Sequence, residues 1–250
     1  MRRRRVGVRS GAGMASAIAW VIVLASSAHA TGGGRAVTEA PMIPGSAPVG
    51  AYTAAAVTRG GPPRDPLRDA IVEDARAAAR RAGRPAPIAD ARLDWAMTDL
   101  ARHLRGDQLP SLEAVAFLLS HYGLCEPSPH FFFARASPGT DDEIRARARD
   151  EFAVALRAGA VGRIGVGIDR SGPEVHVVAG FQETPLVLRA AIARRLRLGG
   201  TARVAARIDA AYHDPELVIT SPDGRVHEAQ AARGRDLSGE VRCDADGRYQ

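Results

Sequence analysis

Histidine is the residue type in this chain best suited to acid–base chemistry. His103, His121 and His130 lie near the ends of two predicted helices and the start of a predicted strand. Imidazole transfers protons near neutral pH, and a carboxylate such as Glu113 or Glu151 would complete an acid–base pair. The three histidines are therefore candidates for a shared cleft. The simpler alternative is that each is separately solvated or bonded to backbone.

Nucleophilic catalysis has no comparable support. The chain contains no Gly-x-Ser-x-Gly motif, so a Ser–His–Asp triad could be assembled only from scattered residues. We assign no catalytic residue and no metal or other cofactor.

The two cysteines, Cys125 and Cys243, are 118 positions apart. An oxidising compartment would permit a disulfide between them, which could contribute about 4–5 kcal/mol by restricting the unfolded chain. The alternative is that they lie in different structural units as separate thiols.

Glycines at positions 162, 165 and 167 superficially resemble a phosphate-binding loop. A dinucleotide site requires a strand, a turn and a helix, whereas these glycines lie in a predicted strand that leads into a hairpin. We predict that they permit close backbone packing.

Two further clusters have competing interpretations. Phe131, Phe132 and Phe133 are half of the six phenylalanines, and they predict a core strand rather than a ligand groove. The arginines at 194, 195 and 197 predict a solvated face rather than a contact with an anionic surface.

Composition and charge restrict the class of partner. The 250 residues are 46% hydrophobic and 5% aromatic, so a core is expected to use many small side chains. The formal charge is +6, but five of the 34 basic residues lie within the first nine positions, which leaves 29 basic against 28 acidic residues. This balance argues against nucleic-acid binding. Every basic residue is arginine, which favours a GC-rich genome over selection for phosphate binding.

Residues 1–30 have the three parts of a secretory signal peptide. Arg2–Arg5 form a basic region, residues 14–24 are apolar, and Ala28-His29-Ala30 presents small residues before a cleavage point between Ala30 and Thr31. The mature protein is expected in the periplasm or outside the cell, without stable membrane insertion, because eleven apolar residues are short for a bilayer span. An uncleaved N-terminal anchor is the alternative.

The remainder predicts an α+β domain followed by an all-β module. Residues 31–63, rich in Gly, Ala and Pro, are expected to form a flexible linker. Hydrophobic spacing and capping residues predict four helices and one buried strand before a hairpin, and only strands follow Pro185. The predicted helices span residues 65–83, 90–104, 111–123 and 140–159, the last with a Thr140–Glu143 capping box; the strand spans 130–135, the hairpin strands 163–169 and 174–179, and the later strands 186–189, 202–208, 216–220, 225–229 and 237–242.

Two segments of the first domain resemble one family. Residues 90–103 are similar to the opening helix of bacterial CAP (SCP-like) domains, and residues 163–181 are similar to their closing hairpin. The resemblance covers residues 65–182. It implies an α-β-α sandwich over residues 64–182, and the strands of residues 185–250 would then form a small Ig-like β-sandwich.

The family's metal ligands are not matched. Leu100 occupies the position of the first histidine, and His103 is the nearest alternative. Residues 150–157, where the second ligand would lie, contain no histidine. The resemblance therefore implies a degenerate domain that has lost its metal site.

The function expected from these observations is that of an exported, non-catalytic protein of the bacterial envelope or exterior, which binds or presents an unidentified ligand. One alternative is an exported hydrolase that uses the histidine cleft, and another is an accessory module of a longer secreted polypeptide. Residues 248–250 begin a strand without room to finish it, so we also expect the β-sandwich to be incomplete or marginal.

Overall fold

The computed structural model describes residues 44, 48, 50–53, 62–104, 110–126, 128–159, 161–210, 212, 215–228 and 231–249. The predicted signal peptide, with its cleavage point between Ala30 and Thr31, and most of the predicted linker lie outside these residues. Within the described ranges, no helix is both long enough and apolar enough to cross a bilayer.

Four helices form where the hydrophobic spacing predicts them. They are α1 (Pro66–Arg81), α2 (Ala91–His103), α3 (Leu112–His121) and α4 (Asp141–Ala158). The side chains of Asp65, Asp90 and Ser111 cap α1, α2 and α3 by accepting a hydrogen bond from a backbone N–H in the first turn.

The capping box predicted for α4 is wrong at Thr140. Its backbone, with φ −100° and ψ 24°, departs from the extended conformation of the other three caps, and its side chain makes no capping bond. The Thr140 hydroxyl instead donates to the carbonyl of Ser137 over 2.7 Å. Three acidic residues in the first turn, Asp141, Asp142 and Glu143, favour the helix N-terminus through its dipole.

The α+β part contains a four-stranded sheet in the order β2 (Ile88–Ala89), β4 (Arg163–Asp169), β5 (Val175–Gln182) and β3 (His130–Ala136). The β2 and β4 strands are parallel, whereas β4–β5 and β5–β3 are antiparallel. The predicted hairpin is confirmed, with Gly165 opposite Gly180.

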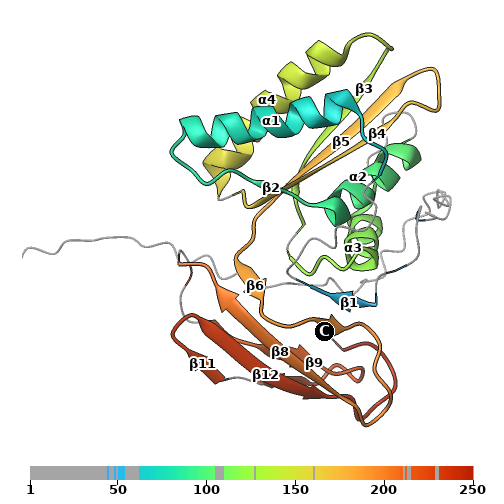
Figure 1. Cartoon of the computed structure of the whole chain (residues 1–250). Coiled ribbons are helices and arrows are strands. Elements are labelled where there is room, and N and C mark those ends of the chain that lie inside the picture. The colour runs from blue at the N-terminus through green and yellow to red at the C-terminus, as the bar shows by residue number, and fades with distance from the viewer. Residues whose placement is uncertain are drawn as a thin grey trace, which may run out of the picture. The chain divides into compact units, whose positions relative to one another are not determined.

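Helices cover both faces of this sheet (Figure 1). One core cluster joins α1 and α4 to one face, and a second joins α2 and α3 to the other. Strand β3 contributes to both, because Phe132 is buried in the first cluster while Phe131 and Phe133 are half-buried against the second. The phenylalanine segment is therefore a core strand, as predicted, although its α2–α3 face is only partly buried.

Glycines allow α2 to lie directly against the sheet. A Cβ added at Gly165 would lie 2.5 Å from Leu93, and one added at Gly167 would lie 2.0 Å from the backbone nitrogen of Thr98. The predicted packing role of these two glycines is confirmed.

Among the described residues after Gln182 the regular elements are strands only, as predicted, and they form small open sheets (Figure 1). The largest sheet has the order β11 (Ala231–Arg233), β12 (Asp236–Arg242), β8 (Thr201–Ile208) and β6 (Leu186–Leu188). Strand β9 (Val218–Thr220) pairs with β10 (Val226–Glu228), and β7 (Ile192–Ala193) pairs with β1 (Ala51–Tyr52). The protein is a mixed α+β structure in its described part.

Candidate binding site

A pocket of about 170 Å³ lies where the start of α1, the face of α2 and the end of β4 meet. Its most distinctive feature is a set of four arginine side chains: one precedes α1, one belongs to α1, one to α2 and one to the β4–β5 turn. The lining consists of Arg64, Arg68, Arg102, Arg170, Asp65, Thr98, Val166, Ile168, Pro62 and Pro63.

Arg68 links α1 to α2 and is mostly buried. Its Nη1 donates to Asp69 over 2.7 Å, and its Nη2 donates to Asp94 over 2.5 Å. The other carboxylate oxygen of Asp94 accepts from the backbone N–H of Val166 over 2.8 Å. Burial raises the pKa of Asp94, and the ion pair with Arg68 opposes that rise. Asp94 thus fixes Arg68 relative to both α2 and β4.

Arg170 fixes the opposite side of the pocket. Its Nε donates to Asp65 over 2.8 Å, and its Nη2 donates to Asp141 over 2.8 Å. Burial raises the pKa of Asp65, but hydrogen bonds from Arg170 and from the Leu67 amide outweigh it, so the pKa lies below its ordinary value. The guanidinium of Arg170 therefore joins the β4–β5 turn to the N-termini of α1 and α4.

Arg64 and Arg102 differ in how they are held. Among the described residues, Arg64 is exposed and has no carboxylate partner. Arg102 is 41% exposed in its side chain and pairs with Asp99 over 3.3 Å. The hydroxyl of Thr98 donates to the carbonyl of Asp94, one turn earlier in α2, over 2.8 Å. The lining therefore offers guanidinium donors, while its hydroxyl is engaged within its own helix.

A second group of charges is buried beside α2. Arg92 donates to Asp90 over 2.7 Å and to the carbonyl of Gly123 over 3.2 Å. Arg163 pairs with Asp90 at 3.4 Å and with Glu126. All four charged side chains are at least 93% buried. The two positive charges of the arginines balance the two negative charges of Asp90 and Glu126. Because the four residues come from α2 and its cap, from β4 and from the loop after α3, this buried network connects these three parts of the fold.

The three candidate histidines have separate environments. The Nδ1 of His103 lies 2.7 Å from the carbonyl of Asp99 in its own helix. The ring of His121 packs against Tyr122, with centroids 4.9 Å apart. His130 pairs with Glu151 of α4 over 3.3 Å and stacks on Phe181, which belongs to the α1–α4 cluster. His130 therefore lies on the α4 face of the sheet, whereas His103 and His121 belong to helices on the other face.

The other residues considered for chemistry are also placed. Glu113, in the first turn of α3, is exposed. Cys125 is an exposed free thiol and Cys243 a half-buried one. Although the residue is exposed at the surface, desolvation by the protein atoms around its thiol and the Glu126 carboxylate raise the pKa of Cys125 to about 11, which disfavours the reactive thiolate.

Leu100, at the position matched to a family metal ligand, is fully buried in the α2–α3 cluster. Across the described residues, no three His, Cys, Asp or Glu side chains converge as metal ligands.

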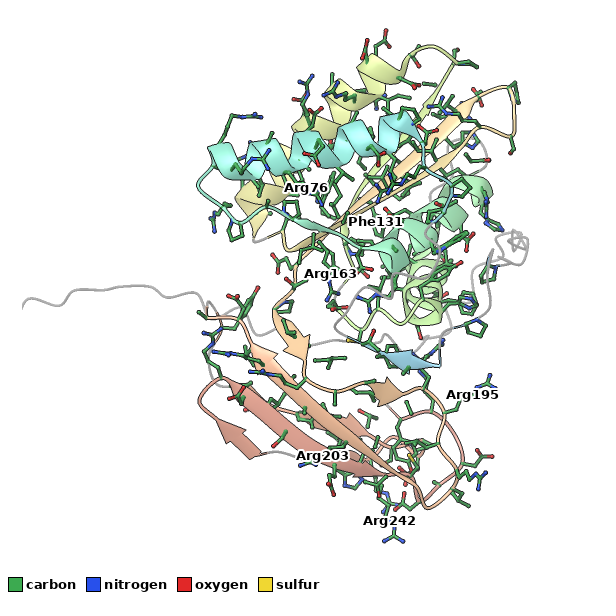
Figure 2. All side chains as sticks on the ribbon, viewed as in Figure 1. Arg76, Phe131, Arg163, Arg195, Arg203 and Arg242 are labelled. Atoms are coloured by element: carbon green, nitrogen blue, oxygen red, sulfur yellow. The ribbon has the colours of Figure 1, made fainter. Side chains whose placement is uncertain are left out.

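The arginines near position 195 differ in their contacts: Arg194 packs against other residues, whereas Arg195 is exposed. Arg194 donates to the carbonyl of His121 over 3.1 Å, and its guanidinium lies 5.7 Å from the Tyr52 ring. Arg195 is exposed and extends away from the ribbon (Figure 2).

Sequence reasoning missed both the pocket and the buried network. Their pairs join residues far apart in the chain: 26 positions separate Arg68 from Asp94, and 37 separate Arg163 from Glu126. The only sequence pattern near the pocket or the buried network was the pair of aspartates that cap α1 and α2, Asp65 and Asp90. No known family model matches the chain, and no curated protein matches it.

Proposed function

We propose that this chain is an exported, non-catalytic binding protein of the bacterial envelope or exterior. Its α+β part, residues 64–182, is a degenerate CAP-like domain, and residues 185–250 form a β-sandwich-like module. The two segments that resemble the family, α2 and the β4–β5 hairpin, support this assignment because they pack directly on each other.

The arginine pocket is the observation that carries the binding function. Its four arginines present guanidinium donors suited to oxygen anions; three of them also pair with carboxylates, and Arg64 has no such partner among the described residues. The carboxylate of Asp65 and the hydroxyl of Thr98 are engaged in structural bonds. The described residues that line this pocket include no histidine. Recognition without turnover is therefore the chemistry that its residues favour.

Binding is tested with the protein beginning at Thr31 and a panel of small anions, cations and uncharged compounds. We expect only anions to raise the melting temperature, and we expect the bound compounds to be recovered unchanged. The double variant Arg64→Gln/Arg102→Gln should lose the response. The exposed Arg84 lies outside the lining, so Arg84→Gln makes a matched control that should keep it. Chemical conversion of the anion, or equal stabilisation by cations, would contradict the proposal.

Export is tested by expressing the full chain in a Gram-negative host and fractionating the cells. The expected product is periplasmic or secreted and begins at Thr31. Full-length protein confined to the cytoplasm would contradict the assignment to the envelope or exterior.

A further inference from the structure

We infer that the arginine pocket binds a short-chain organic monocarboxylate, an inference that rests on the proposed binding function. A carboxylate head would lie against Arg64 and Arg68, and a short hydrocarbon part would lie against the apolar lining residues.

Arg64 and Arg68 supply the hydrogen-bond donors. A guanidinium has five N–H donors in a planar fork, which matches the two oxygens of a carboxylate. The bonds from Arg68 to Asp69 and Asp94 each use one terminal nitrogen, and they also hold the side chain in place. Arg64 precedes α1 and reaches the same pocket from a neighbouring position in the chain. One guanidinium held by carboxylates and one exposed guanidinium can therefore share one anion.

The charge around the pocket favours a single negative charge. Three of its arginines already hold carboxylates: Arg68 holds Asp94, Arg102 holds Asp99, and Arg170 holds Asp65 and Asp141. Arg64 is the one lining arginine without such a partner among the described residues. These carboxylates would repel a doubly charged phosphate about twice as strongly as they repel a singly charged monocarboxylate at the same distance.

The lining and the volume restrict the rest of the ligand. Val166, Ile168, Pro62 and Pro63 provide apolar surface beside the guanidinium groups. At about 170 Å³ the pocket is smaller than the roughly 300–1,000 Å³ of pockets for drug-sized ligands. A branched acid of a few carbons combines a suitable head with an apolar body.

The inference is tested by ligand-observed NMR titration of the protein beginning at Thr31. The probes are isovalerate, its uncharged isostere isovaleramide, acetate and inorganic phosphate. We expect isovalerate to bind with a dissociation constant on the order of 1 mM, typical of so small a ligand. Acetate should bind at least about fivefold more weakly because it lacks the branched hydrocarbon. Isovaleramide and phosphate should bind more weakly still.

Arg64→Gln should weaken isovalerate binding about tenfold, since it removes a charge-assisted hydrogen bond. Arg84→Gln removes the same charge elsewhere on an exposed surface and should leave the dissociation constant unchanged. Circular dichroism establishes that both variants are folded. Equal affinity for isovaleramide, tighter binding of phosphate, or equal effects of the two substitutions would overturn the carboxylate assignment. A response to other anions alone would overturn it and leave the binding function standing, whereas no response to any anion would overturn both.

Discussion

The buried network beside α2 places four charges where water is largely excluded. Burial of each charge is unfavourable alone, and the network is stable because Arg92 and Arg163 face Asp90 and Glu126. No periodic pattern marks these residues, because their partners come from different elements. From the sequence alone, Arg163 would be expected to be an ordinary exposed polar residue at the start of a strand.

Arg163→Met should destabilise the protein by about 3–5 kcal/mol, because the Glu126 carboxylate would stay buried without this cation. Urea unfolding at pH 7 followed by circular dichroism measures the change. Asp223→Asn disrupts an exposed pair with Arg225 and should leave the unfolding midpoint unchanged. Similar midpoints for Arg163→Met and the unaltered protein would show that the network does not stabilise the fold.

The same network predicts a loss of stability in acid. Burial raises the pKa of Asp90, but bonds from Arg92 and the charge of Arg163 outweigh it, so the folded-state pKa lies below the unfolded value near 3.8. The unfolded state therefore binds a proton first as the pH falls. The stabilisation from Asp90 is present above pH 3.8 and is lost as the pH falls through the lower folded-state pKa. Urea unfolding from pH 6 to pH 2.5 should show a shallower acid loss in Asp90→Asn; an identical acid loss would contradict this assignment.

Helices and longer strands were predictable because their signals are local. Asp65 and Asp90 precede apolar residues at helical spacing, and Arg163–Asp169 alternates as a strand should. The two-residue strands β1, β2 and β7 were not predicted, since a segment so short has no periodicity and is defined by its partner. At Thr140 the prediction failed in the opposite way: the sequence contains a capping-box pattern, but the side chain makes no capping bond in the structure.

The contact between α2 and β4 depends on the absence of a side chain at Gly167. Gly167→Ala would place a methyl group 2.0 Å from the Thr98 backbone nitrogen, so α2 must move away from the sheet. We expect destabilisation of at least about 3 kcal/mol, at the upper end of overpacking changes. Gly172 in the following turn has open space around its Cα, and Gly172→Ala should be nearly neutral. Thermal unfolding compares the two, and equal melting temperatures would contradict this tight packing.

At the scale of the whole molecule, the change from helices to strands after Gly159 was predictable because hydrophobic periodicity changes there from 3.6 to 2. The pocket could not be predicted from the sequence, because its lining residues are spread between positions 62 and 170 and only the folded chain brings them together. The sandwich arrangement of residues 185–250, their incompleteness and the flexible linker stay predictions.

The two cysteines provide a test that spans the molecule. Both are free in the structure, so the protein beginning at Thr31 should show two titratable thiols per chain when unfolded without reductant. A value near zero would indicate the Cys125–Cys243 disulfide that an oxidising compartment permits. In the folded protein, alkylation of Cys125 should rise with pH toward its pKa of about 11.

The central claim, that this protein binds its ligand in the arginine pocket, is tested most directly by mapping where a ligand acts. Isovalerate is added to the ¹⁵N-labelled protein beginning at Thr31, and backbone amide shifts are followed by two-dimensional NMR. The account predicts saturable shifts concentrated at Arg64, Thr98, Val166 and Ile168, with their loss in Arg64→Gln and their retention in Arg84→Gln. Saturable shifts confined to other parts of the chain, or no saturable shift in a folded protein, would contradict it.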